Sequence, residues 1–173
     1  MTWLLTASGT HFDLVDPQPD MINVFDIAQG LANECRYTGQ CRWFYSVAQH
    51  ATLASQIVPD ELTLEALLHD AAEAYIKDIP RPLKLLLPDY REIERRVDAV
   101  IRDRFRLPTS MSDAVKHADI VMLATERRDL MAEDDTEWEI LRGVTPLDKR
   151  IRYIPPRVAE AHFLRRLLEI GLA

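Results

Sequence analysis

The stretch Leu67-Leu68-His69-Asp70-Ala71-Ala72-Glu73 places three polar side chains inside an otherwise apolar run of helical character. At about 100° per residue, His69, Asp70 and Glu73 share one side of a helix. Burying an imidazole and two carboxylates among leucine and alanine is costly unless another group compensates them. A divalent metal ion does so, because adjacent nitrogen and oxygen ligands can bind one cation. The stretch therefore predicts a helix that contributes to a metal site.

The chain as a whole has the composition of one globular domain. It has 173 residues, 47% of them hydrophobic and 28% charged, and residues 1–173 are expected to form a single domain. The net charge of −7 disfavours a broad nucleic-acid surface, which is normally basic. Without a signal-like N-terminus or a long apolar run, the sequence predicts a cytoplasmic protein with no membrane segment. Cys35 and Cys41 lack zinc-site spacing and are expected to be ordinary half-buried thiols.

Apolar periodicity around the motif predicts a mainly α-helical fold. The expected helices cover residues 23–33, 43–57, 61–76, 89–106, 111–133 and 157–170. Residues 3–15 contain two short extended runs around a Ser-Gly turn, which predicts a small N-terminal hairpin. Two prolines exclude a regular helix over residues 78–82, and residues 134–156 have no regular pattern. The charged helix at 89–106 and the 134–156 segment are candidates for a homodimer contact.

Two further polar residues lie within apolar patterns. His50 shares a helical stripe with Val47 and Leu53, so it is expected to face the core, and taken alone it favours a core histidine bonded to a carbonyl. Asp119 lies on the same helix side as Met122, although a lone helical aspartate is more often exposed. His117 points elsewhere, and a surface or structural role is favoured for it.

Cations follow the motif on a loop that prolines stiffen. Arg81 and Lys84 could bind phosphate there, the arginine as a two-pronged donor and the lysine as a point charge. Solvated loop charges are an equally good interpretation. Arg36, beside Tyr37, has the same two interpretations.

Several of these residues together resemble a known family. His50, the adjacent His69-Asp70 pair and Asp119, in the order H…HD…D, resemble the ligands of the metal-dependent HD-domain phosphohydrolases. The segments that look like its 5′-deoxynucleotidase-like branch are Ser46-Val47-Ala48-Gln49-His50, His69-Asp70-Ala71-Ala72-Glu73, Asp78-Ile79-Pro80 and Pro82-Leu83-Lys84. Trp3 through Phe12 and Cys35-Arg36-Tyr37 resemble a bacterial and phage subgroup of that branch. The resemblance extends from about residue 3 to residue 170.

The resemblance implies an HD-domain helical bundle with one divalent ion, which would be Mn, Co, Fe, Zn or Mg. The implied metal ligands are His50, His69, Asp70 and Asp119. Glu73 would be the acid/base residue, and Asp78 a second polar group of the catalytic pocket. Arg36 and Lys84 would contact phosphate, and Tyr37 would lie near the sugar. Gln29 and Gln40 stand where the subgroup tends to carry histidines, and histidines for a second metal are not evident, so one metal is expected.

The expected activity is release of phosphate from a small-molecule nucleotide, foremost a deoxynucleoside 5′-monophosphate. One alternative is a dNTP triphosphohydrolase with the same metal core. Another is a non-enzymatic helical binding module in which the histidines and aspartates are structural. A mononuclear iron oxygenase also uses two histidines and a carboxylate, but the sequence has no β-barrel pattern.

Overall fold

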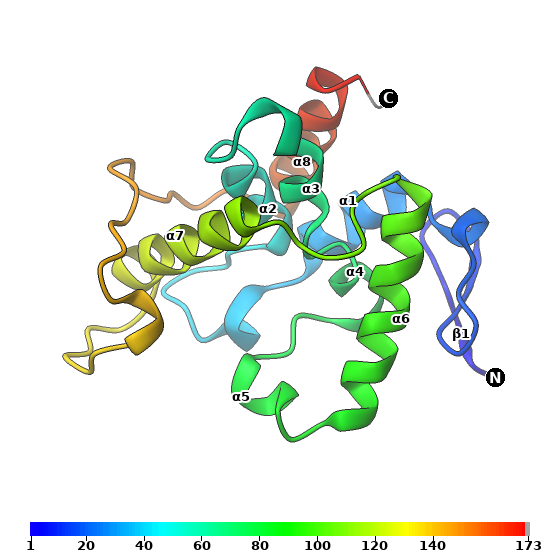
Figure 1. Cartoon of the computed structure of the whole chain (residues 1–173), viewed down its shortest axis with the longest axis horizontal. Helices are drawn as coiled ribbons and strands as arrows, with labels where there is room; N and C mark the ends of the chain where they lie inside the picture. Colours follow the sequence, from blue (N-terminus) through cyan, green and yellow to red (C-terminus); the bar gives the residue numbers. More distant parts are fainter. Residues whose placement is uncertain (172–173) are drawn as a thin grey trace.

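The computed structural model describes residues 1–171 and is built from α-helices with one small antiparallel hairpin (Figure 1). The α-helices are α1 (Val24–Asn33), α2 (Val47–Ala54), α3 (Thr63–Leu68), α4 (Glu73–Ile76), α5 (Arg81–Lys84), α6 (Pro88–Arg104), α7 (Asp113–Leu130) and α8 (Pro156–Glu169). Short 3-10 helices are η1 (Pro19–Met21), η2 (Arg36–Gly39), η3 (Asp60–Leu62) and η4 (Glu139–Leu141). The predicted all-α fold with an N-terminal hairpin is confirmed.

The hairpin joins β1 (Trp3–Leu5) to β2 (His11–Asp13), with Leu4 opposite Phe12. Phe12 is fully buried and stacks on Tyr75, with 4.1 Å between the ring centroids. The Ser8 hydroxyl in the turn donates to Asp26 at 2.6 Å. The buried Phe12 ring and the hydrogen bond from Ser8 to Asp26 therefore attach the hairpin to the helices.

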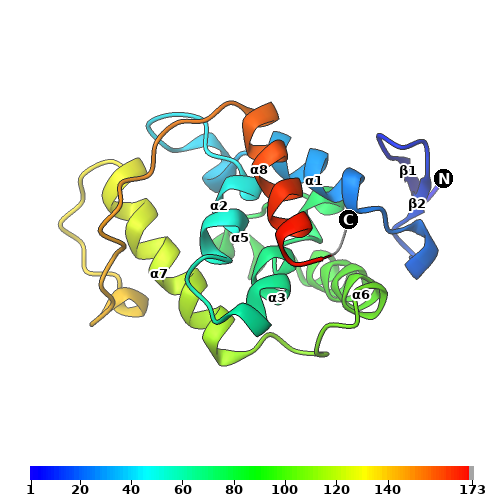
Figure 2. The same cartoon turned by 90° about the horizontal axis from the view of Figure 1, so that it is seen from above.

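Helices α1, α2 and α8 form the centre of the molecule (Figure 2), and α1 also packs on α4. Asn23 caps α1 by accepting a hydrogen bond from the Phe25 amide at 2.9 Å, which satisfies a free helix-end donor. The largest buried apolar cluster includes Ile27, Leu31, Val47, Leu67, Leu68, Val97, Ile101, Phe163 and Leu167. A smaller cluster next to α7 contains Tyr45, Ala54, Met122, Leu130 and Ile151. Together they fix α2 between α8 and α7.

The prediction of one continuous helix over 61–76 is wrong, because the motif itself interrupts it. After Leu68 the backbone makes tighter i→i−3 turns, in which the Ala71 amide donates to the Leu68 carbonyl and the Glu73 amide to the Asp70 carbonyl, both at 3.0 Å. Side chains three residues apart eclipse one another in such turns. Asp70 and Glu73 are therefore aligned more closely than an α-helix would place them.

Prolines lie in the first turn of α5, α6 and α8. Residues 78–80 are irregular as predicted, but α5 begins at Arg81, since Pro82 falls in the first turn where proline is tolerated. Residues 134–156 are irregular except for η4 and the first residue of α8.

Across residues 1–171, no helix is both long enough and apolar enough to cross a membrane.

Candidate metal centre

Two buried imidazoles meet where α2 passes the end of α3. His50 lies in α2, which begins at Val47 after the Ser46 hydroxyl caps it by accepting from the Gln49 amide. His69 directly follows α3, and the tight turn after Leu68 directs its ring towards α2. The two Nε2 atoms are 3.2 Å apart.

Two aspartates complete the cluster. Oδ2 of Asp70 lies 3.2 Å from Nε2 of His69 and 3.5 Å from Nε2 of His50. Oδ1 of Asp119, from α7, lies 3.3 Å from Nε2 of His50. The ligand atoms of His50, His69 and Asp119 all lie within 4.8 Å of one another. This cluster could hold a metal ion, and the structure brings the four predicted ligands together.

The hydrogen bonds of the two rings suit metal binding. Nδ1 of His69 donates to the Ala66 carbonyl at 2.7 Å, and Nδ1 of His50 lies 2.6 Å from the Glu126 carboxylate. With both Nδ1 atoms protonated, the Nε2 lone pairs face each other and two carboxylates, so four electron-rich atoms converge. Two nitrogens and two oxygens form a donor set that divalent transition metals accept. The hydrogen bond at Nδ1 fixes the orientation of each imidazole ring.

The charges around His50 are consistent with a cation bound at this position. Burial and the Arg36 charge both disfavour the imidazolium, yet Glu126 and Asp119 raise the pKa of His50 to about 9. The surrounding carboxylates therefore strongly favour a positive charge at this position.

Glu126 is a residue of the site that the sequence analysis missed. It is fully buried in α7 and accepts hydrogen bonds from the hydroxyls of Tyr37 and Tyr45, besides that from His50. It follows Asp119 by seven residues, which is two helical turns, so both side chains face the same way. That spacing is the signal by which the sequence could have identified it.

Arg36 and Tyr37 lie behind the ligands. Arg36 is nearly buried, with Nη1 3.1 Å from Oδ2 of Asp70 and Nε 3.5 Å from Glu126. Tyr37 and Thr38 have left-handed backbone angles, with φ of 56° and 52°, which are unfavourable for residues other than glycine. The bond from Tyr37 to Glu126 helps to hold this strained turn in place. Arg36 and Tyr37 were predicted to bind substrate. In the structure both contact Glu126, the residue that hydrogen-bonds to His50.

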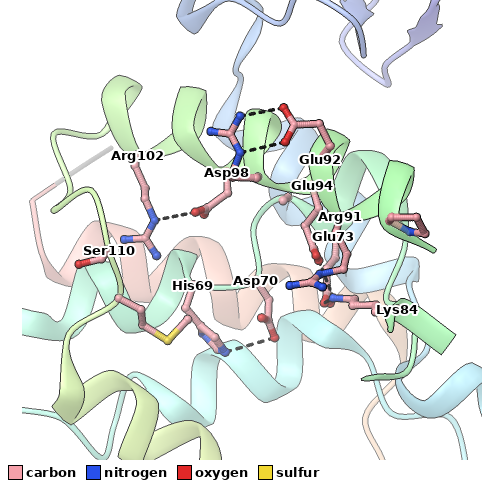
Figure 3. Close-up of a pocket in the computed structure, with 14 residues that line it drawn as sticks. His69, Asp70, Glu73, Lys84, Arg91, Glu92, Glu94, Asp98, Arg102 and Ser110 are labelled. Carbon is pink, nitrogen blue, oxygen red and sulfur yellow. Dashed lines mark hydrogen bonds and ion pairs between the residues drawn. The ribbon is translucent and has the colours of Figure 1, made fainter. Parts of the chain in front are cut away.

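A cavity of about 640 Å³ adjoins the cluster. His69 and Asp70 lie at its floor, α6 forms one wall, and Glu73, Lys84 and Arg91 gather at one end (Figure 3). Its volume is in the range of small-molecule sites. A compact ligand could therefore reach this cluster of candidate metal ligands.

Glu73 lines this cavity in an environment that favours its protonated form. Oε1 lies 3.6 Å from Nζ of Lys84, while Oε2 is buried and has no hydrogen-bond partner among residues 1–171. Burial, then the charges of Asp70 and Asp78, raise the pKa of Glu73 well above its ordinary value. A carboxyl group with a raised pKa in a cavity is a candidate for proton transfer.

The other predicted residues lie farther out. Asp78 is half-buried, and burial raises its pKa. Lys84 lines the cavity and contacts Glu94 at 2.5 Å as well as Glu73. Arg81 is exposed at the start of α5, with no ion pair to any described residue and no place in the cavity lining. The exposed position of His117 is as predicted, and Cys35 and Cys41 are half-buried free thiols.

No family model matches the chain. It is similar to the uncharacterized protein YfdR of Escherichia coli strain K12, with 49% identity over 173 residues that cover 99% of this chain and 97% of that protein. It is also similar to the uncharacterized protein RCAP_rcc00048 of Rhodobacter capsulatus, with 32% identity over 95% of this chain and 93% of the other. With nearly full-length matches at these identities, the chain belongs to the same family as YfdR.

Proposed function

We propose that the protein is a metal-dependent phosphohydrolase that releases phosphate from nucleotides, foremost deoxynucleoside 5′-monophosphates. The observation that carries the proposal is the convergence of His50, His69, Asp70 and Asp119 beside a cavity that Glu73 also lines. The metal ligands, a protonatable carboxyl group and cations on one cavity are what hydrolysis of a phosphate ester requires.

The residues of this site divide the work of hydrolysis. A divalent ion held by the four ligands would lower the pKa of a coordinated water and polarise a phosphoryl oxygen. In its ionised form, Glu73 takes a proton from the attacking water as the water oxygen bonds to phosphorus. It then gives this proton to the sugar oxygen as the ester P–O bond breaks. Arg36 keeps Asp70 and Glu126 in position, and Asp78 supports the raised pKa of Glu73.

The charges of the cavity favour a monophosphate over a triphosphate. Lys84 is paired with Glu94, Arg95 with Glu92, and Arg102 with Asp98. These pairs leave little positive charge for the β- and γ-phosphates of a dNTP, which are usually bound by several cations. We therefore rank the triphosphohydrolase second.

The substrate is a small-molecule nucleotide, and we place the protein in the cytoplasm, where Cys35 and Cys41 would stay reduced. A homodimer through the charged helix α6 is testable by light scattering.

The test is a hydrolysis panel of dNMPs, NMPs and dNTPs with protein loaded with Mn, Co, Fe, Zn or Mg. Orthophosphate from dNMPs, absent with Glu73→Gln, is the expected result. Tripolyphosphate from dNTPs would instead establish the triphosphohydrolase. A folded protein that binds no metal and hydrolyses no nucleotide would contradict the proposal and favour the binding module.

A further inference from the structure

The two cations that the resemblance assigns to phosphate are already neutralised. The Arg36 guanidinium contacts Asp70 at 3.1 Å and Glu126 at 3.5 Å, and it does not line the cavity. Nζ of Lys84 lies 2.5 Å from Glu94 and 3.6 Å from Glu73. A phosphate dianion therefore needs another positive group besides the metal site.

Helix α6 supplies three further cations to the cavity, and two of them are paired. Arg95 contacts Glu92 through two hydrogen bonds of 2.8 and 3.1 Å. Arg102 is buried, donating to Asp98 and to the Pro108 carbonyl, both at 2.8 Å. Both guanidinium groups therefore already have a carboxylate partner on α6.

Arg91 differs from these two arginines. It lines the same cavity, its side chain is exposed, and it has no ion pair with any carboxylate of residues 1–171. Figure 3 draws the Arg91 side chain towards the end of the cavity that Glu73 and Lys84 also line. The N–H donors of the planar Arg91 guanidinium group are therefore available to a ligand in the cavity.

We infer that Arg91 binds the substrate phosphate, an inference that rests on the proposed function. The guanidinium fork matches two phosphate oxygens, and such charge-assisted pairs are the stronger class of hydrogen bond. Lys84 then acts as a positioning residue, since it links Glu73 of α4 to Glu94 of α6. Arg36 acts as a positioning residue for Asp70. A single unpaired arginine also fits one terminal phosphate better than a triphosphate chain.

The experiment compares the wild type, Arg91→Gln, Arg91→Lys and Arg95→Gln, each loaded with Mn²⁺. Arg95 is a matched control because it lies one turn further along α6 and lines the same cavity but is paired. The affinity for inorganic phosphate is measured by calorimetry, and KM and kcat are measured for a dNMP.

Arg91→Gln is expected to weaken phosphate binding and raise KM by about tenfold or more, the usual effect of losing a charge-assisted hydrogen bond. Arg91→Lys restores part of the phosphate affinity, since it keeps the charge without the fork. Arg95→Gln stays within about twofold of the wild type. Phosphate affinity and KM that Arg91→Gln leaves unchanged would overturn the inference.

Failure of the proposed function gives a different pattern. A wild type that hydrolyses no nucleotide, yet binds phosphate through Arg91, would retain the inference for an anion site and reject the reaction. Nucleotide hydrolysis that is insensitive to Arg91→Gln would retain the reaction and reject the inference. A wild type that neither binds phosphate nor hydrolyses nucleotides would reject both.

Discussion

The Glu126 carboxylate lies 2.6 Å from Nδ1 of His50, and this buried contact joins α7 to the face of α2 that carries the candidate ligand His50. It fixes which ring nitrogen carries the proton, and so leaves Nε2 of His50 directed towards His69, Asp70 and Asp119. The same carboxylate accepts from two tyrosines. Glu126, which the sequence pattern did not single out, thus orients His50 and stabilises the turn that carries Arg36 and Tyr37.

Glu126→Gln is predicted to lower metal affinity by about 10- to 100-fold, the usual effect of losing a group that orients a ligating histidine. The amide keeps the shape of the side chain but removes the charge that raises the basicity of His50. Titration with Mn²⁺ measures the change. Glu133→Gln, at an exposed residue just beyond α7, should bind like the wild type, and equal affinity in a folded Glu126→Gln would contradict this role.

Glu73→Gln is predicted to keep the metal and lose phosphate release by roughly 10²- to 10⁴-fold, the range for general acid–base residues. The variant removes the proton-transferring group but none of the four ligands. Metal content and phosphate release are measured on the same sample. Glu92→Gln, in the cavity wall but half-exposed and paired with Arg95, serves as the control. Hydrolysis by Glu73→Gln at the wild-type rate would exclude Glu73 from the mechanism.

Gly30→Ala is predicted to destabilise the fold, even though alanine favours a helix over glycine by about 1 kcal/mol. A Cβ at Gly30 in α1 would lie 2.8 Å from the Ala74 Cβ and 2.9 Å from its carbonyl oxygen in α4. Forcing these helices apart typically costs about 1–3 kcal/mol, so the clash outweighs the helix propensity. Thermal unfolding measures the change. Gln29→Ala, at the preceding exposed position, should not lower the melting temperature.

Much of the site was predictable from local pattern. His50 and Asp119 stood on apolar helical stripes, and the HD pair lay in an apolar run. These features depend only on residue spacing within one segment, which the sequence displays directly. The hairpin was predictable for the same reason, since it forms between near neighbours.

What the sequence analysis missed depends on packing between segments. Apolar spacing over four residues does not distinguish i→i−3 from i→i−4 turns, so the break at His69 was not visible. The pairing of Lys84 with Glu94 arises only when α5 folds back on α6. The role of Glu126 likewise needs α2 and α7 in contact.

Asp129→Asn is predicted to lower the free energy of unfolding by about 1–3 kcal/mol at neutral pH. Burial alone would raise the pKa of Asp129, but hydrogen bonds from Arg128, Ile151 and Arg150 lower it well below the ordinary value. A depressed folded-state pKa gives stabilisation that is present above the unfolded pKa of about 3.9 and is lost as the pH falls through the folded value.

Urea unfolding of the wild type and Asp129→Asn should therefore give a difference that is constant near neutral pH and narrows below about pH 4. Asp148→Asn, on the exposed segment that Asp129 anchors, should show no such difference. A gap between wild type and Asp129→Asn that widened in acid would contradict this assignment.

Metal content tests the central claim most directly. Wild type and the variants Asp70→Ala, Asp119→Ala and His117→Ala are loaded with Mn²⁺, desalted and analysed by elemental mass spectrometry, with folding checked by circular dichroism. One ion per chain is predicted for the wild type and for His117→Ala, whose histidine is exposed, and little or none for the two aspartate variants. A full complement of metal in folded Asp70→Ala and Asp119→Ala, or none in the wild type, would contradict the metal centre.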